Sequence, residues 1–589
     1  MRILGLNAYH GDSSAALLED GRFVSGVEEE RLNRVKHWAG FPGLAVRQVM
    51  DDAAAGLDEV DAVAVSRDPS AHLLEKVLFA FRRRPSLEAV RSRLSNQVNV
   101  LGLEERLSGL DRGRFRGKSH RVEHHLAHLA SSFFCAPFEE AACLTVDGFG
   151  DFLSSMSAVG RGNRLVPIDQ VAFPHSLGIF YTAMTQFLGF PKYGDEYKVM
   201  GLAAYEEPGF LGQVREGGGL RTDGTFETSP EYFRHATKGV TMSWDDGEPT
   251  IGPLWGERLR EILGPEREAR DELTDRHRDL ASSLQAMYEE AFFHRLRWLQ
   301  GKTGLNALCL AGSCAMNSVA NGKIFRETDF REVYIQSAAG DAGTALGSGL
   351  YVWHQVLGKP RDFVMEHSYW GPGYSDERVQ SAVREAIPGL EEDPGPAGVS
   401  VGDFNVERHE EEQLLCHETA KAIASGEIVG WYQGRGEWGP RALGNRSIVV
   451  DPRRADMKDV LNARIKRREA FRPFAPSILE ESTAEYFEES YPDPFMIKVY
   501  PIRPEKRAMI PAVTHVDGTG RLQTVSKRQN PRYWALIKAF EERTGVPVLL
   551  NTSFNENEPI VNTPEEALAC FFRTKMHRLV MGNWVVARR

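Results

Sequence analysis

The chain has 589 residues, 42% of them hydrophobic and 26% charged, which is enough for two or three globular domains. Its 71 basic and 82 acidic residues give a formal charge of −11, so the molecule as a whole lacks the positive surface of a nucleic-acid-binding protein. The six cysteines form no CxxC pair, which argues against a zinc ribbon and favours reduced thiols in a cytoplasmic protein. No signal peptide or bilayer-spanning stretch is found, so we expect neither nucleic acid nor a membrane as a partner.

The first thirty residues predict a strand, a polar turn and a hairpin. Residues 3–6 alternate as a strand, NAYHGDSS forms the turn, and the hairpin reverses at Asp20-Gly21. Actin-like ATPases begin in this way, with the amides of the turn facing the nucleotide phosphates. Asp12, in the turn, is placed to orient a hydroxyl or a metal-bound water, and Lys36 in the following charged run is able to reach a phosphate. The alternatives are a surface hairpin and a solvated helical face.

A possible metal site lies between residues 124 and 151. His124 and His128 are four residues apart in HHLAHLASSF, which places both imidazoles on one face of a helix. The run AACLTVDGFGD predicts a buried strand that ends in an Asp-Gly turn and holds Asp147 at its carboxyl end. Two imidazoles and a carboxylate favour iron, zinc or manganese. The alternative is a pair of helix-surface histidines beside an ordinary turn.

Two glycine-rich turns in the next two hundred residues suggest a nucleotide site. We expect helices at residues 44–55 and 268–300, a buried strand at 60–66, and an insertion at 70–120. AGSCAMNS predicts a strand, a turn and a helix start, whose backbone N–H groups suit an anion or the edge of a nucleotide. AGDAGTALG predicts a second such turn and supplies Asp341 as a fourth metal ligand. The residues expected at the nucleotide are Lys198, Gly312, Ser313, Asn317 and Gly340, and for Lys198 a salt-bridged loop is an equal alternative.

The C-terminal part of the chain places arginines on rigid turns. Prolines and glycines around residues 355–405 indicate a linker or connecting layer, so we expect domains at 1–360 and 405–589 with the connection at 361–404. GRGEWGPRALGNRSI carries Arg435, Arg441 and Arg446, and later segments add Arg472, Arg521 and a strand end at Asn551 to Ser553. Arginines held in this way suit bidentate capture of phosphate or carboxylate. Binding to a nucleic-acid backbone is the alternative that the acidic balance disfavours.

Taken together, these segments resemble the O-carbamoyltransferases that modify antibiotics and nodulation factors. The resemblance rests on HHLAHLASSF, TVDGFGD, KVMGLAAY, AGSCAMNS, GDAGTALG, GRGEWGPRALGNRSI, FRPFAPSI and LNTSFN in this order, over nearly the whole chain. It implies an α/β protein with a duplicated N-terminal actin-like (ASKHA) domain and a C-terminal YrdC-like domain. It also implies a role in the biosynthesis of a natural product.

The resemblance further implies a two-step reaction with ATP, accompanied by magnesium, as cosubstrate. The YrdC-like domain takes up carbamoyl phosphate through Arg441, Arg472, Arg521, Asn551 and Ser553, and carbamate then attacks ATP to give carbamoyl-adenylate. The ASKHA domain transfers the carbamoyl group to a hydroxyl of a small acceptor. There the family holds iron(II), and His124, His128, Asp147 and Asp341 match its ligands. Asp12, His10 and Lys36 match the catalytic region, although here the order is His10-Gly11-Asp12 and not an adjacent His-Asp pair.

Two other functions remain open from the sequence. One is a threonylcarbamoyl-type tRNA-modifying enzyme, against which the acidic balance counts. The other is a non-carbamoylating actin-like ATPase, which leaves the histidines and arginines without a task. The acceptor is not specified by the sequence, and we expect its determinants in residues 70–120 and 206–255. A homodimer is left open as the assembly.

Overall fold

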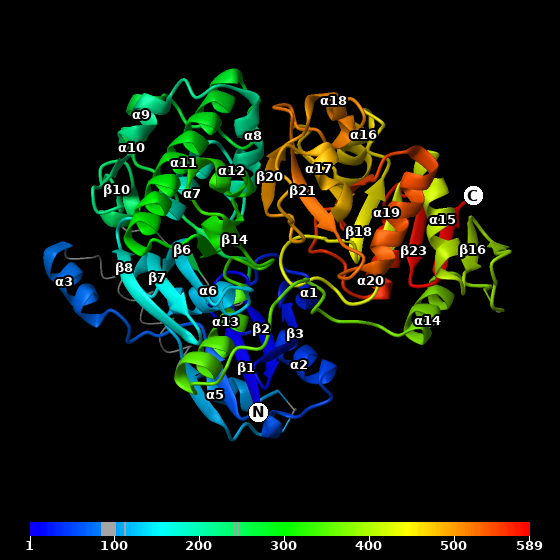
Figure 1. Ribbon diagram of the computed structural model, residues 1–589, viewed down its shortest axis with the longest axis horizontal. Helices are drawn as coiled ribbons and strands as arrows, with labels where there is room; N and C mark the ends of the chain where they lie inside the picture. The colour runs from blue at the N-terminus through cyan, green and yellow to red at the C-terminus, as the bar shows by residue number, and fades with distance from the viewer. Residues whose placement is uncertain (84–101, 111–112, 239, 241, 244–246, 391) are drawn as a thin grey trace. The chain divides into compact units, whose positions relative to one another are not determined.

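The computed structural model describes residues 1–83, 102–110, 113–238, 240, 242–243, 247–390 and 392–589. These residues divide into two compact units, Met1–Met365 and Glu366–Arg589. Both combine helices with sheets, which confirms the α/β class (Figure 1). The expected domain boundaries stay a prediction; residues 366–404, most of the expected connection, belong to the second unit. Among the described residues, no helix is both long enough and apolar enough to cross a membrane.

The first unit contains two five-stranded sheets of the same topology. One has the order β3-β2-β1-β4-β5, built from β1 (Arg2–Asn7), β2 (Ser14–Glu19), β3 (Arg22–Glu28), β4 (Ala62–Val65) and β5 (Lys118–Arg121). The other has the order β14-β13-β6-β7-β8, built from β6 (Glu140–Gly150), β7 (Leu153–Arg161), β8 (Arg164–Ala172), β13 (Ala307–Ala311) and β14 (Glu332–Tyr334). In each, an antiparallel meander continues into two parallel strands. This repeat is the duplicated arrangement that the resemblance implied.

Two helices connect the halves of this duplication. Helix α13 (Gly343–Tyr351) packs on β1 and β2, while α6 (His124–Phe133) packs on β6 and β13, and the two helices pack against each other. The contact is very close, since a Cβ atom at Gly347 would lie 1.9 Å from the carbonyl oxygen of Ala127. Glycine at this position therefore lets the helices approach, and the two halves of the unit are joined through α6 and α13.

The other helices of the first unit follow the predicted periodicity. The expected helix at 44–55 is α2, and the one at 268–300 is α11, which begins later because Thr274 caps its first turn in a capping box with His277. The described residues of the 206–255 segment form only short elements, as expected, whereas part of the 70–120 segment lies outside the described residues. The helices are α1 (Glu30–Asn33), α2 (Gly43–Asp52), α3 (Leu73–Arg83), α5 (Leu103–Ser108), α7 (Leu177–Phe187), α8 (Glu196–Leu202), α9 (Leu211–Arg215), α10 (Glu257–Leu263), α11 (Asp275–Thr303) and α12 (Ser318–Glu327). Small two-stranded sheets pair β9 (Gly218–Leu220) with β10 (Phe226–Thr228) and β11 (Met242–Ser243) with β12 (Thr250–Ile251).

The second unit is organised on one ten-stranded mixed sheet. Its order is β15-β16-β24-β23-β17-β18-β22-β19-β21-β20, in which only β17 with β23 and β19 with β21 are parallel pairs among the described strands. The strands are β15 (Val399–Val401), β16 (Phe404–Arg408), β17 (Val429–Tyr432), β18 (Arg446–Val450), β19 (Ala475–Leu479), β20 (Lys498–Pro501), β21 (Thr519–Val525), β22 (Val548–Ser553), β23 (Arg578–Met581) and β24 (Trp584–Arg588).

Helices pack on this sheet around a core that includes the fully buried Trp431 and Trp584. Helix α15 packs against α19, and α14 against α20. Asn530 and Thr563 cap α19 and α20 with their side chains, and a proline follows each cap, where its missing N–H costs nothing. The helices are α14 (Asp376–Ala386), α15 (Glu412–Ala424), α16 (Met457–Leu461), α17 (Thr483–Tyr486), α18 (Pro504–Arg507), α19 (Pro531–Thr544) and α20 (Pro564–Arg573).

Candidate active site

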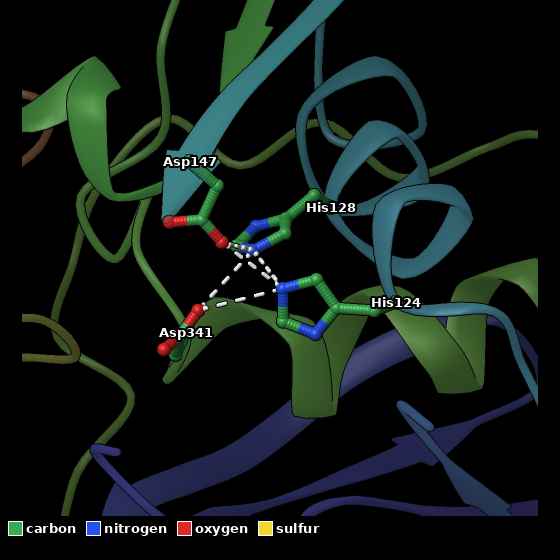
Figure 2. Close-up of side chains that lie close together, drawn as sticks. All are labelled: His124, His128, Asp147 and Asp341. Carbon is green, nitrogen blue, oxygen red and sulfur yellow. Dashed lines mark hydrogen bonds and ion pairs between the residues drawn. The ribbon is translucent and has the colours of Figure 1, made fainter. Parts of the chain in front are cut away.

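The four side chains expected as metal ligands lie together in the first unit. Helix α6 presents His124 and His128 one turn apart, β6 presents Asp147, and Asp341 comes from the turn before α13 (Figure 2). Nε2 of His124 lies 3.0 Å from Oδ2 of Asp147, and Nε2 of His128 lies 3.3 Å from Oδ1 of Asp341. All four residues are at most 3% exposed. We call them the His-Asp cluster.

The backbone around Asp147 differs from the sequence expectation. An Asp-Gly turn was expected at residues 147–148, and this was wrong: β6 continues to Gly150, and the chain reverses at Asp151 and Phe152, which both have positive φ. Regular pairing with β7 is interrupted between Val146 and Gly150, so Asp147 still lies where the regular ladder ends. The close packing explains Gly150, because a Cβ there would lie 2.0 Å from the His124 ring.

Opposite charges stabilise the His-Asp cluster. Burial disfavours a charge on His128, but the carboxylates of Asp147 and Asp341 outweigh burial and raise the pKa of the imidazole to about 9. Burial likewise opposes ionisation of Asp147, yet the hydrogen bonds from His124 and His128 hold its pKa well below the usual range. The neighbouring His125 forms a hydrogen bond with Thr145 Oγ1 at 2.6 Å, and burial lowers its pKa to about 4.

The donor set of the cluster fits a borderline metal ion. One ligand atom from each of the four residues lies within 4.8 Å of the other three. The two Nε2 atoms are only 3.1 Å apart, and the buried Oδ1 of Asp341 accepts no hydrogen bond from the described part of the chain, so facing donor atoms of the cluster are incompletely satisfied. Two imidazole nitrogens with two carboxylate oxygens suit iron, zinc or manganese better than magnesium or calcium. The residues present therefore fit the expected iron(II).

Groups from other elements hold this cluster in place. Nδ1 of His10 lies 2.7 Å from Oδ2 of Asp341, and the backbone N–H of Ser313 donates to Oδ1 of Asp147 at 3.1 Å. Tyr193 OH is 3.5 Å from Asp341 Oδ2. Burial disfavours charging of His10, but Asp341 raises the pKa of this imidazole overall. Although its position in the sequence is displaced, His10 thus reaches the cluster through its contact with Asp341.

Asp12 and Lys36 lie beside a histidine that the sequence did not single out. Nδ1 of His37 is 2.7 Å from Oδ1 of Asp12, and the His37 backbone N–H donates to Glu30 at 2.8 Å. Burial opposes a charge on His37, yet Asp12 raises its pKa to about 9. The His37 ring packs edge-on against Tyr193 at 5.3 Å between centroids. Lys36 is exposed next to this pair.

The residues expected at a nucleotide fall into two groups. Gly312, Ser313 and Gly340 lie together, since the Gly312 N–H donates to Ala339 O at 2.9 Å and a Cβ at Gly340 would lie 3.7 Å from Ser313 Oγ. The two glycine-rich turns are therefore adjacent, as the sequence suggested.

Asn317 and Lys198 are engaged with protein groups. Asn317 caps α12 through Ala320 N and exchanges two hydrogen bonds with Gln285, and Lys198 pairs with Asp195 at 2.8 Å. A contact of either side chain with a ribose stays a prediction.

The arginines expected at carbamoyl phosphate lie together in the second unit. Burial lowers the pKa of Arg521 well below its usual value, and the nearby charges of Arg441, Arg468 and Arg472 lower it further. Nε of Arg521 is buried and has no hydrogen-bond partner among the residues that the structure describes. We call these four residues the arginine cluster. Because it gathers like charges, it is suited to a polyanionic ligand.

Asn551 and Ser553 connect this cluster to a buried lysine. Asn551 Nδ2 donates to Ala442 O at 3.1 Å, and its buried Oδ1 has no hydrogen-bond partner within the described ranges. Lys466 Nζ donates to Ser553 Oγ at 3.2 Å and to Asn555 Oδ1 at 2.7 Å. Burial lowers the pKa of Lys466 well below its usual value, followed by the charges of Arg468 and Arg472. The sequence analysis missed Lys466 and Arg468, although KRR just before FRPF was a visible basic run.

Two other arginines of the same segments have a structural role. Arg446 donates to Gln433 O at 2.6 Å and Asn445 O at 3.0 Å and lies 3.8 Å above the Tyr432 ring. Arg435 donates to Trp370 O and Gly371 O. Both donate hydrogen bonds to backbone carbonyls of the second unit. These partners, and not the neighbouring sequence, distinguish the two residues from those of the arginine cluster.

Comparisons with known proteins identify the family of this chain. Family models match residues 2–350 as "Carbamoyltransferase N-terminus" and residues 420–588 as "Carbamoyltransferase C-terminus". The chain belongs to the carbamoyltransferase family. It is 40% identical to an uncharacterized protein of Synechocystis sp., over 100% of this chain and 96% of that protein. It is 38% identical to the nodulation protein NolNO of Sinorhizobium fredii, over 99% of this chain and 80% of the relative.

Solved structures are more distant from this carbamoyltransferase. T. kodakarensis HypF aligns with a TM-score of 0.31 and 13% identity, over 61% of this chain and 48% of that chain. The family match therefore rests on the two sequence models and on the relatives at 38–40% identity. Members of this family transfer a carbamoyl group to an acceptor, and this chain is accordingly a carbamoyltransferase.

Proposed function

We propose that this carbamoyltransferase is an ATP-dependent O-carbamoyltransferase that uses carbamoyl phosphate and passes through carbamoyl-adenylate. The observation that supports it most is the presence, in one chain, of an anion-binding arginine cluster in the second unit and a His-Asp cluster in the first. Each suits one half of the reaction. The match of both family models to this chain supports a common task for the two clusters.

In the second unit, Arg441, Arg472 and Arg521 are proposed to bind carbamoyl phosphate, with Asn551 and Ser553 at its carbamoyl end. Water releases phosphate from carbamoyl phosphate and leaves carbamate. An oxygen of carbamate then attacks the α-phosphorus of ATP, the bond to the β-phosphate breaks, and pyrophosphate leaves with the electron pair. An anion that enters the cluster offsets the repulsion among its like charges, and this favours binding.

In the first unit, the acceptor hydroxyl is proposed to attack the carbamoyl carbon of the adenylate. The carbon–oxygen bond to the phosphate breaks, AMP leaves with the electron pair, and Asp12 accepts the hydroxyl proton. The contact with His37 fixes the Asp12 carboxylate. His124, His128, Asp147 and Asp341 would hold iron(II), which supplies Lewis-acid polarisation of a carbonyl oxygen when bound. Lys36, Gly312, Ser313 and Gly340 are proposed to contact the nucleotide.

Isotope exchange tests this proposal. The full chain is incubated with ATP and labelled pyrophosphate, with and without carbamoyl phosphate. We expect label to enter ATP only when carbamoyl phosphate is present, because the adenylate must form for the exchange to occur. Exchange without carbamoyl phosphate, or none under either condition, would contradict the adenylate route. Threonylcarbamoyl adenylate chemistry would instead require threonine and bicarbonate in the same assay.

The acceptor is proposed to be a small hydroxylated natural product or sugar. The name of the NolNO relative and those of other relatives, such as nodulation protein U of Bradyrhizobium diazoefficiens at 27% identity, place them in nodulation, which is compatible with a glycan-type acceptor. Screening sugars and aminoglycosides with carbamoyl-labelled carbamoyl phosphate, and following label into product, identifies the class. A homodimer remains part of the proposal and is measured by light scattering.

A further inference from the structure

Arg67 is an arginine beside the His-Asp cluster that neither the sequence motifs nor the family positions above include. It follows β4 by two residues, at the carboxyl end of a strand that is parallel to β1 and β5. In sheets of this kind ligands bind at the carboxyl ends of the strands. The next residue, Asp68, donates its backbone N–H to Asp151 Oδ2 at 2.8 Å, and the same oxygen accepts the His124 N–H at 3.0 Å. The Arg67 loop is thus tied to the first turn of α6, which carries the cluster.

The guanidinium of Arg67 is charged but makes no ion pair with any residue that the structure describes. Its Nη1 donates to Tyr9 O at 2.6 Å, next to His10. None of its nitrogens is both buried and without a partner, so the remaining N–H groups keep access to solvent. Burial lowers the pKa of Arg67, and the carboxylates of Asp151 and Asp341, which lie beyond contact distance, offset part of this effect. A half-buried arginine oriented by one backbone bond, with donors to spare, is suited to bind an anion.

We propose that Arg67 binds the phosphate of carbamoyl-adenylate in the first unit and stabilises AMP as it leaves. This inference rests on the proposed function, because it takes the adenylate as the substrate of that unit. The phosphate is the anionic part of that intermediate, and the planar guanidinium fork matches two of its oxygens. Tyr9 O fixes the position of the fork, so the side chain is ordered before the ligand arrives.

The chemistry of the transfer step gives Arg67 more than a binding task. The phosphate of the adenylate carries one negative charge while it is joined to the carbamoyl carbon. As the acceptor oxygen bonds to that carbon, the carbon–oxygen bond breaks and its electron pair stays on the phosphate, so AMP leaves with two negative charges. A cation in contact with the phosphate therefore stabilises the transition state more than the ground state.

Calorimetric titration of metal-loaded full chain with AMP and with adenosine tests the inference. We expect Arg67→Gln to weaken AMP binding about tenfold to hundredfold and to leave adenosine binding within about twofold, since only AMP has the phosphate. Glutamine keeps an N–H donor for Tyr9 O and removes the charge. The matched control is Arg121→Gln, an exposed arginine at the end of β5 in the same sheet. AMP affinity within twofold of the wild type in Arg67→Gln would overturn the inference.

A second measurement avoids any substitution. Phenylglyoxal modifies accessible arginines, and mass spectrometry locates the modified residue. AMP is expected to protect Arg67 of the wild-type chain and adenosine is not; equal modification with and without AMP would overturn the inference even if the variants fail to fold.

The role of Arg67 and the proposed function can be refuted independently of each other. Absence of carbamoyl-phosphate-dependent pyrophosphate exchange in the wild type removes the proposed function, whereas normal exchange with unchanged AMP binding in Arg67→Gln removes the role of Arg67 alone.

Discussion

The His-Asp cluster and the arginine cluster differ in how the charges of their side chains are compensated. In the first, the carboxylates of Asp147 and Asp341 attract the His128 imidazole and raise its pKa to about 9. In the second, burial and neighbouring positive charges lower the pKa of Arg521, and Nε of Arg521 stays unpaired. The first cluster is therefore held together by its own charges. The second gathers buried like charges, and under the proposed function the relief of their repulsion favours binding of an anion.

Removal of a ligand from the His-Asp cluster is expected to have the largest effect. His128→Ala takes away one of four converging donors, and we expect metal affinity to fall by roughly a hundredfold or more, with loss of acceptor transfer. Carbamoyl-phosphate-dependent pyrophosphate exchange, assigned to the second unit, is expected to persist. Elemental analysis of anaerobically purified protein measures the metal. The control is His417→Ala, an exposed histidine of α15. Full metal content in His128→Ala would show that the ligand set is wrong.

In the arginine cluster the corresponding change affects ligand binding alone. Arg472→Ala removes one charge-assisted partner of the anion, which is worth about 2 kcal/mol, so carbamoyl phosphate affinity is expected to fall roughly thirtyfold. Metal content is expected to stay unchanged. Calorimetry measures the affinity, and Arg454→Ala, which removes an exposed arginine paired with Asp456, is the control. Unchanged affinity would remove Arg472 from the site.

The Asp12–His37 pair extends the comparison to pH. The folded-state pKa of His37 is about 9, above its ordinary value of 6.5, and Glu30 and Lys36 are the other charged groups beside it. The pair therefore stabilises the fold fully below pH 6.5, and this contribution is lost as the pH rises through about 9. Because both side chains are partly exposed, we expect His37→Gln to cost roughly 1–2 kcal/mol of unfolding free energy at pH 6 and little at pH 10. Denaturant unfolding at both pH values measures it, and an equal cost at both would contradict the pairing.

The smallest expected effect is that of a change at Arg521 on stability without ligand, and this effect distinguishes the two clusters most directly. Arg521→Met removes a buried charge from a group of like charges, so in phosphate-free buffer we expect it to raise the free energy of unfolding by about 1 kcal/mol. Inorganic phosphate is expected to stabilise the wild type and to have less effect on the variant. Thermal unfolding with and without phosphate measures both quantities. A destabilised variant in phosphate-free buffer would mean that Arg521 is held by partners other than a ligand.

Elements with strong local patterns were predicted correctly from the sequence. The HxxxH spacing of His124 and His128 was sufficient because residues four apart share a face of any helix. The hairpin at Asp20-Gly21 was predicted because both residues tolerate the positive φ that the turn requires. The turn after β6 was misplaced because Asp-Gly is a frequent turn pair. The chain instead reverses at Asp151 and Phe152, and local sequence does not favour the positive φ that Phe152 adopts there.

The sequence by itself determined the α/β class, the residues of both clusters expected from the family, and the family itself. It did so because helix periodicity, glycine turns and ordered motifs are properties of neighbouring residues. Only the tertiary structure decided which charges act together: it separated Arg446, bound to backbone carbonyls, from Arg521, left with an unpaired nitrogen, and it placed His10, His37 and Arg67 near the first cluster. These roles depend on burial and on partners distant in the chain, and neither is a property of local sequence.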